Sequence, residues 1–208
     1  MKRAITVTLA SARRVLSPQL AVFLLAVVCS LGFSFIIYPA IASPQNAVLD
    51  PDRYGALGFG LWHHGTLSYY PDPQPTLDRG PIYPAVIAVI LWLSGGVWPQ
   101  SLQAAQAVFF GLTSVLVFYI GEKVWGRRTA MAAAALTTVH PFLLWYTSRV
   151  WIETLATLLF TALAASLVFF HERPGIRRGM LVGAVAGVAT LCKATFLPFL
   201  LFVPMVLL

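Results

Sequence analysis

The sequence predicts an all-α polytopic membrane protein with about five transmembrane helices and a pair of interfacial helices in its first extracytoplasmic loop. Hydrophobic residues make up 59% of the chain and charged residues only 10%, and the mean hydropathy is +0.80. Soluble globular domains carry about 25% charged residues, so this composition excludes that class. The longest polar stretch, residues 43–80, lies between apolar runs and is the place to look for chemistry.

The charge pattern also argues against a nucleic-acid partner. The net charge of +7 comes from short basic clusters between apolar runs, and in a membrane protein such clusters mark the loops that face the cytoplasm. Cys29 and Cys192 each lie within an apolar run. They therefore predict neither a disulfide nor a metal-binding cysteine pair.

The first expected element is a membrane anchor. Residues 1–19 form a cytoplasmic tail that carries four basic residues, Lys2, Arg3, Arg13 and Arg14. Residues 20–42 follow as the first transmembrane segment, whose apolar run from Leu20 to Ile41 is about 22 residues long and sufficient to cross a bilayer.

Residues 43–100 form the predicted extracytoplasmic loop. Tyr54, Leu57 and Leu61 have helical spacing and predict a short helix on the membrane surface that starts after Asp50-Pro51, with Asp50 as its cap. The apolar run at residues 82–93 is too short to span, because about 12 helical residues rise about 18 Å and the hydrocarbon core is about 30 Å thick.

The distribution of Lys and Arg supports an interfacial or re-entrant helix at residues 82–93. If that run does not cross, most basic residues lie on the cytoplasmic side and only Arg53, Arg79 and Arg149 lie outside. If it crosses, every later segment inverts and most of the basic residues lie outside, which violates the positive-inside rule.

Residues 103–208 supply four further transmembrane segments, so residues 1–208 form a single transmembrane domain. Their apolar runs cover residues 104–120, 130–146, 152–170 and 180–208. His140-Pro141 predicts a kink in the second of these runs. Gly183 and Gly187 have the small-xxx-small spacing that lets helices approach closely.

Several ionisable residues are candidates for a site on the outer side. Lys193 stands within an apolar run, where an ionisable side chain usually marks a functional or paired position. Each candidate also has a structural explanation. Lys193 can extend to the interface, Asp50 can serve only as a helix cap, Arg53 and Arg79 can anchor loops, and Glu153 can pair with Arg149.

Taken together, the polar motifs resemble a known family. The loop motifs Asp50-Pro51-Asp52-Arg53-Tyr54 and Asp78-Arg79-Gly80-Pro81-Ile82-Tyr83-Pro84 are similar to the first extracytoplasmic loop of the GT-C glycosyltransferases, in particular the aminoarabinose-transferase and protein O-mannosyltransferase branch. Later landmarks of that family are matched in order by Trp125-Gly126-Arg127-Arg128, Glu153, the Gly183 to Gly187 segment and Leu191-Cys192-Lys193.

The resemblance implies transfer of a sugar from a polyprenyl-phosphate carrier to a lipid, glycan or protein acceptor on the extracytoplasmic face, with inversion at the anomeric carbon. It implies that Asp50 is catalytic and that three cations, Arg53, Arg79 and Lys193, bind the donor phosphate. It implies supporting roles for three acids, Asp52, Asp78 and Glu153. One base and several cations suit this reaction, because the phosphate leaves as an anion and the acceptor hydroxyl must lose a proton.

The resemblance also sets expectations about partners and location. We expect a protein of the cell membrane with a cytoplasmic N-terminus, in contact with membrane lipid and a polyprenyl-phosphate-linked sugar. Family members are longer, so a missing C-terminal half or another membrane subunit is an expected partner. The metal ligands and cofactor stay unknown, with a divalent cation left open. The alternative function is a non-catalytic membrane subunit or transporter fragment that binds an anionic polyprenyl lipid.

Overall fold

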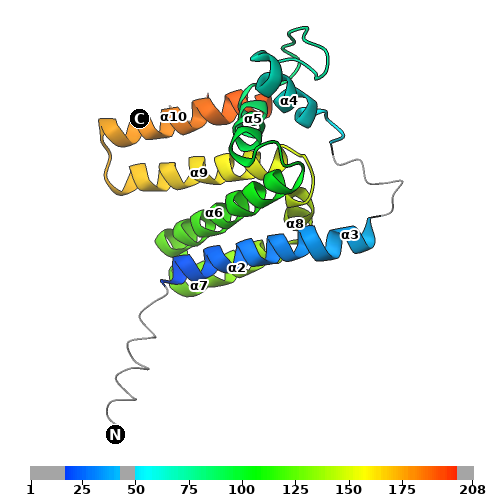
Figure 1. The fold of residues 1–208 in the computed structure, drawn as a ribbon. Coiled ribbons are helices and arrows are strands. Elements are labelled where there is room, and N and C mark those ends of the chain that lie inside the picture. Colours follow the sequence, from blue (N-terminus) through cyan, green and yellow to red (C-terminus); the bar gives the residue numbers. More distant parts are fainter. Residues whose placement is uncertain (1–16, 43–49, 201–208) are drawn as a thin grey trace, which may run out of the picture.

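The computed structural model describes residues 17–42 and 50–200, and these residues are predominantly helical (Figure 1). Within the described ranges no β-strand forms, and the only pairing of that kind is an isolated bridge between Ser68 and Pro75. Three helical segments are long and apolar enough to cross a membrane: Pro18–Ile41, Gln100–Trp125 and Glu153–Glu172. The chain is therefore an all-α membrane protein, which confirms the predicted fold class.

The first span consists of α2 (Pro18–Gly32), a π-helical turn η1 (Phe33–Ile37) and α3 (Tyr38–Ile41). Ser17 caps its start, because the Ser17 Oγ accepts a hydrogen bond of 3.2 Å from the backbone N–H of Leu20. Many large apolar side chains of this span stay exposed, as expected of a helix whose outer face meets lipid. The most exposed are Val28, Ile36 and Ile41.

The long helix α6 (Gln100–Trp125) lies at the centre of the bundle and packs against α2, α7 and α9. Two glycines of α6 allow this close packing. A Cβ at Gly111 would lie 2.8 Å from the ring of Phe23 on α2, and a Cβ at Gly121 would lie 2.8 Å from the Cα of Ala130 on α7. Small residues thus bring helices together at Gly111 and Gly121, as the sequence suggested for a different pair, Gly183 and Gly187.

That different pair, Gly183 and Gly187, lies on α10 (Ile176–Cys192). A Cβ at either position would meet no atom within 4 Å. Within the described chain these glycines do not face a neighbouring helix, so the prediction of close approach there is wrong. Sequence spacing shows that two small residues share a helix face, but it does not show which face is packed.

The apolar run at residues 130–146 is divided between two helices, α7 (Arg127–Thr138) and α8 (Pro141–Thr147). His140 has an extended backbone, and Pro141 occupies the first turn of α8. A proline is tolerated there because its missing N–H would have no partner within the helix. The predicted kink at His140-Pro141 is confirmed.

The last described helices are α9 (Glu153–Glu172), α10 and a 3₁₀ turn, η2 (Ala194–Phe196). Lys193 lies between α10 and η2 with an extended backbone, φ −145° and ψ 119°. The sequence places Lys193 within an apolar run, whereas the structure ends the helix there. The lysine thus lies at a helix end, close to other polar groups.

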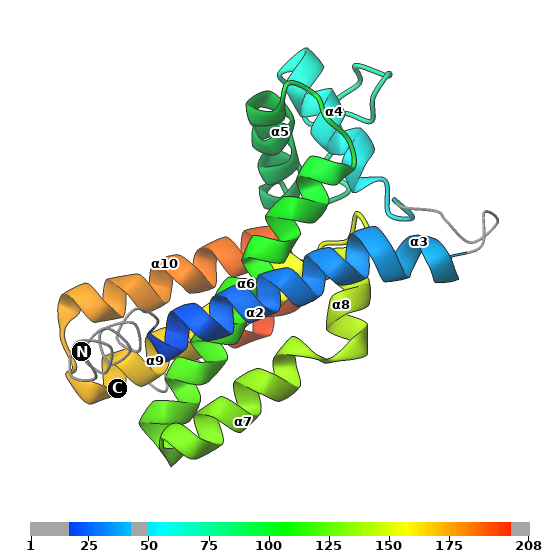
Figure 2. The same ribbon diagram turned by 60° about the horizontal axis from the view of Figure 1, so that its bottom comes forward.

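The helical passes run back and forth between two ends of the bundle (Figures 1 and 2). One end, which we term the basic end, holds the start of α2 and the α6–α7 and α9–α10 turns. Six basic residues lie in these turns or in the helix ends beside them: Lys123, Arg127, Arg128, Arg173, Arg177 and Arg178. The other end, which we term the site end, holds the end of α3, the starts of α6 and α9, and Lys193.

The helices α4 (Tyr54–His64) and α5 (Ile82–Ser94) pack against each other at the site end and do not continue through the bundle (Figure 2). With 13 residues, α5 rises about 20 Å, less than the hydrocarbon thickness of about 30 Å. One face of α5 is buried, and the other exposes Trp92 and Leu93. An apolar helix of this kind suits the membrane interface, and its position relative to a bilayer stays a prediction.

A single apolar core unites the site end. It joins buried residues of α4, α5, α6, α9 and α10, so the segments that carry the candidate polar residues are held in one rigid region. Its buried members are Tyr54, Leu57, Tyr83, Ile87, Leu91, Leu102, Val150, Ile152, Leu155 and Cys192.

Candidate functional site

The carboxylate of Asp50 lies at the start of α4. Its Oδ2 accepts hydrogen bonds from the backbone N–H groups of Gly55 at 2.8 Å and Ala56 at 3.3 Å. Asp50 therefore caps the helix, as predicted, but α4 begins only at Tyr54, after a turn in which Arg53 has a φ of 59°. Pro51 lies in that turn, so the helix starts after Asp50-Pro51, as predicted, but without Pro51 in its first turn.

The second carboxylate oxygen of Asp50 has a different environment. Oδ1 is buried and has no hydrogen-bond partner in the part of the chain that the structure describes. Burial raises the pKa of Asp50 above its usual value of 3.8, while the backbone amides of Ala56, Gly55 and Tyr54 oppose this rise. One oxygen thus fixes the side chain, and the other is left available to a proton or a ligand.

Gly55 makes this position of the carboxylate possible. A Cβ at Gly55 would lie 2.7 Å from the Asp50 Oδ2 and 2.8 Å from the ring of Trp98. Only a residue without a side chain lets the aspartate approach the helix N-terminus so closely.

A second polar group comes from the segment before α5. The guanidinium of Arg79 lies 3.6 Å from the Asp52 carboxylate and 5.7 Å from the centre of the Tyr54 ring. The next residue, Gly80, touches the end of α10, because a Cβ there would lie 2.3 Å from the backbone oxygen of Leu191. This contact holds Arg79 beside the helix end that carries Lys193.

The third group is an ion pair between the first residue of α9 and the break after α10. The Lys193 Nζ lies 3.0 Å from the Glu153 Oε1, and the other oxygen, Oε2, is buried without a hydrogen-bond partner in the described chain. The sequence suggested Arg149 as a partner of Glu153, and the structure shows Lys193 as the partner of the Glu153 Oε1. The Arg149 guanidinium lies over the rings of Trp145 and Trp151, at 5.5 and 4.7 Å from their centres.

A buried tyrosine shows that these groups share one neighbourhood. Tyr83 on α5 is completely buried and meets the ring of Tyr54 edge-on at 5.2 Å. Burial raises the pKa of Tyr83 well above 10.0, and the nearby carboxylates of Asp50 and Glu153 raise it further. Tyr83 lies in the same apolar core as Tyr54 of α4, Leu155 of α9 and Cys192 of α10, so the segments that carry Asp50, Glu153 and Lys193 pack around one buried centre.

Two of the predicted residues lie further out. Arg53 is exposed, with its guanidinium 4.3 Å from the centre of the Tyr69 ring in the loop after α4. Asp78 is also exposed, and its backbone N–H donates to the Thr76 Oγ1 at 3.3 Å. Neither side chain forms an ion pair with a described residue.

Two glutamines that were not among the candidate residues predicted from the sequence hold the site together. Gln106 on α6 is completely buried. Its Nε2 donates to the backbone oxygens of Thr147 at 3.2 Å and Arg149 at 2.7 Å, and its Oε1 accepts from the Tyr83 hydroxyl at 3.4 Å. One turn earlier, Gln103 donates to the backbone oxygen of Ser148 at 2.8 Å. In the sequence, the sign of this role was the presence of two glutamines at positions i and i+3, on one face near the start of an apolar helix.

The histidines of α4 do not suggest a metal centre. The ring of His63 stacks with those of Phe59 and Tyr70, and the ring of His64 stacks with that of Tyr70. Among the described residues no group of three or more His, Cys, Asp and Glu is placed to hold a metal ion.

Residues 78–208 match the family model of the dolichyl-phosphate-mannose-protein mannosyltransferases, which covers more than half of the chain. The chain belongs to this family. No curated protein and no solved structure gives a significant match. Membership makes the protein a glycosyltransferase of the GT-C type, which confirms the resemblance.

The matched residues of this mannosyltransferase family include most of the site but not all of it. Asp78, Arg79, Glu153 and Lys193 lie within the match, whereas Asp50, Asp52 and Arg53 precede it. The family match and the geometry around Asp50 are therefore independent observations about two parts of the candidate site.

Proposed function

We propose that this chain transfers a sugar from a polyprenyl-phosphate carrier to an acceptor hydroxyl at the site end of the bundle. Family membership supports a mannosyl or related sugar and a lipid-linked donor. The observation that carries the proposal is the buried Asp50 Oδ1, which has no partner in the described chain and lies on a segment whose core side chains pack with those next to Glu153 and Lys193.

In the proposed reaction Asp50 is the general base. As the acceptor oxygen bonds to the anomeric carbon, the acceptor proton moves to the Asp50 Oδ1. The bond from the anomeric carbon to the phosphate oxygen breaks, and its electron pair leaves with the phosphate. Attack on the face opposite the leaving group inverts the anomeric configuration.

The cations have the complementary role. Negative charge grows on the phosphate as the bond breaks, and fixed cations placed there stabilise the transition state. We assign this role to Lys193, at the end of α10, and to Arg79, next to the Gly80 that contacts this helix end, and a more peripheral donor-binding role to Arg53. Asp52, Asp78 and Glu153 act as supporting acids, since Asp52 and Glu153 hold Arg79 and Lys193 in place.

The substitution Asp50→Asn tests the proposal. Asparagine keeps one oxygen that can accept the Gly55 and Ala56 hydrogen bonds, so α4 is expected to form, but the amide cannot accept the acceptor proton. We expect transfer of sugar from a synthetic polyprenyl-phosphate donor to fall by about 10²–10⁴-fold, with donor affinity unchanged.

A matched control is Asp72→Asn, the same change in an exposed loop aspartate whose Oδ1 accepts from the Gln74 N–H. We expect the control to keep wild-type turnover. Wild-type turnover in Asp50→Asn itself would contradict the proposal. Donor binding without any turnover by the wild type would favour the alternative, a lipid-binding membrane subunit.

A further inference from the structure

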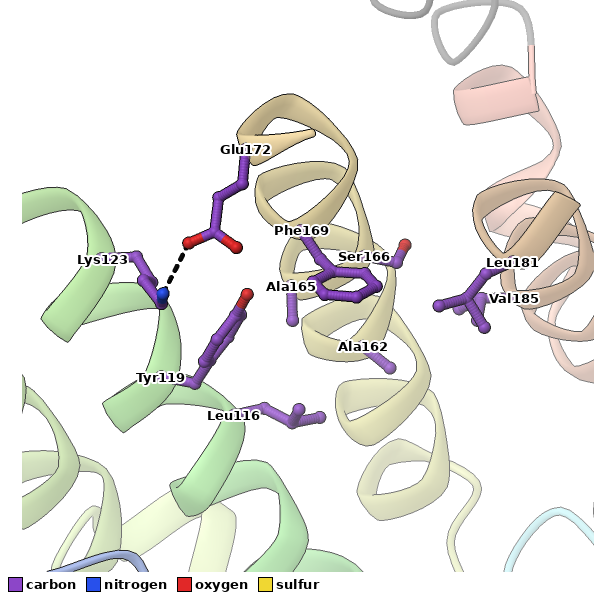
Figure 3. A pocket seen from close by; sticks show the side chains of 10 residues that line it. All are labelled: Leu116, Tyr119, Lys123, Ala162, Ala165, Ser166, Phe169, Glu172, Leu181 and Val185. Atoms are coloured by element: carbon purple, nitrogen blue, oxygen red, sulfur yellow. Dashed lines mark ion pairs between the residues drawn. The ribbon is translucent and has the colours of Figure 1, made fainter. Parts of the chain in front are cut away.

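A cavity lies far from the candidate site, at the basic end of the bundle. It has a volume of about 490 Å³ and is formed by α6, α9 and α10 (Figure 3). Its walls are apolar over most of their area, with Leu116, Ala162, Phe169, Leu181 and Val185 among the residues that line it. A slot of this composition between membrane helices suits a hydrocarbon chain.

The rim of this cavity, which we term the groove, is polar. The Lys123 Nζ lies 2.6 Å from the Glu172 Oε1, and the Tyr119 side chain points toward this ion pair (Figure 3). The Tyr119 hydroxyl is buried and has no hydrogen-bond partner in the described chain. A buried hydroxyl without a partner is unfavourable, and a ligand oxygen at the rim would satisfy it.

Further cations stand next to the same rim. The Arg178 guanidinium lies 3.6 Å from the centre of the Phe169 ring, a ring that lines the groove. Arg173 and Arg177 are exposed close by in the α9–α10 turn and at the start of α10. Among the described residues that line the cavity, Glu172 is the only acid, and it is paired with Lys123. The rim is therefore complementary to an anionic group.

We propose that this groove binds an anionic phospholipid, with one acyl chain along α6, α9 and α10 and the phosphate at Tyr119 and the arginines of the α9–α10 turn. The apolar walls select a lipid over a free phosphate, and the cations select an anionic headgroup over a zwitterionic one. The site lies at the opposite end from Asp50 and Lys193, so the proposal does not depend on sugar transfer.

The test is thermal unfolding of the whole protein in detergent, with phosphatidylglycerol, phosphatidylcholine or inorganic phosphate added. A ligand that binds only the folded state raises Tm. We expect phosphatidylglycerol to raise the Tm of the wild type by several degrees more than phosphatidylcholine does, and inorganic phosphate to have no effect. Equal shifts with the two lipids, or an equal shift with phosphate, would overturn the proposal.

Two matched arginine pairs locate the effect. Arg177→Gln/Arg178→Gln removes the cations beside the groove, and Arg127→Gln/Arg128→Gln removes as much charge from α7, on the other side of α6 (Figure 2). We expect only the first variant to lose the extra shift with phosphatidylglycerol. Equal losses in both variants would indicate attraction to the whole basic end and would overturn a site in the groove.

A third variant tests the slot itself without a change in charge. Ala162→Phe fills the groove and should abolish the extra shift. If this variant does not fold, Leu181→Trp fills the same groove from α10 and should also abolish the extra shift. An unchanged phosphatidylglycerol shift in a folded, filled variant would contradict binding of an acyl chain there.

Discussion

Asp50 uses its two carboxylate oxygens for different purposes. Oδ2 accepts the first amides of α4, and Oδ1 is buried without a partner in the described chain. The helix cap and the proposed base are therefore compatible interpretations of one residue. The cap fixes the direction in which the free oxygen points, and burial makes that oxygen a better proton acceptor than an exposed aspartate.

This environment predicts the pH dependence of activity. The base must be ionised, and burial raises the pKa of Asp50 above 3.8, so kcat/KM should fall with decreasing pH in a limb centred above that value. Protonation has the opposite effect on folding, because a carboxyl whose pKa is raised in the folded state stabilises the fold as pH falls through that pKa. A measured kcat/KM profile with its acid limb at or below 3.8 would contradict Asp50 as the base.

The Glu153–Lys193 pair allows a second prediction at this scale. The two side chains are only 29% and 35% exposed, so Lys193→Met leaves a largely buried carboxylate without its cation and should lower the free energy of unfolding by about 1–3 kcal/mol. The double variant Glu153→Gln/Lys193→Met should recover much of this loss.

Activity should not recover with stability. If Lys193 faces the donor phosphate, both variants should transfer sugar at least about 10-fold more slowly than the wild type, because the lost cation is not replaced. Detergent unfolding and sugar transfer measured on the same preparations separate the two effects. A double variant that regains both would show that Lys193 has only a structural role.

At the scale of elements, α6 organises the site although it carries none of the proposed catalytic groups. Gln103 and Gln106 bind the backbone of residues 147–149, and Gln106 also binds Tyr83 on α5. This network fixes the connection that leads into α9, and so it positions Glu153 relative to α5.

Gln106→Leu tests this role. Leucine leaves the Tyr83 hydroxyl and the Thr147 and Arg149 carbonyls without their amide partner, so we expect a loss of about 1–3 kcal/mol in the free energy of unfolding. Gln100→Leu, the same change at an exposed position of α6, serves as the control and should lose less than about 0.5 kcal/mol. Equal unfolding midpoints for the two variants would contradict the positioning role.

Elements differ in how well the sequence predicts them. Long apolar runs and the His140-Pro141 break follow from composition and local sterics, and both were predicted. The end of α10 at Lys193 was not, since an apolar run continues past it. The helix end there contacts Glu153 and Gly80, residues far away in the chain.

At the scale of the whole molecule, the alternating passes bring all the basic turns to one end and the proposed site to the other (Figure 1). The positive-inside rule predicts that the basic end faces the cytoplasm. The proposed site would then face the extracytoplasmic side, where the family resemblance places sugar transfer.

Labelling of single cysteines checks this orientation. In a background of Cys29→Ser/Cys192→Ser, a cysteine at exposed Thr66 after α4 should react with a membrane-impermeant maleimide in intact cells. A cysteine at exposed Gly175 in the α9–α10 turn should react only after permeabilisation. The reverse labelling pattern would show that the basic end faces outward.

The sequence by itself determined the membrane class, the presence of the long apolar segments, the separation of acids from basic clusters and the family. These properties depend on composition and on residues close together in the chain. Only the tertiary structure decided that Lys193 pairs with Glu153, that Gly80 lies against the end of α10, and that two glutamines hold the site. Such contacts join residues far apart in sequence, and they form only when helix packing brings the corresponding faces together.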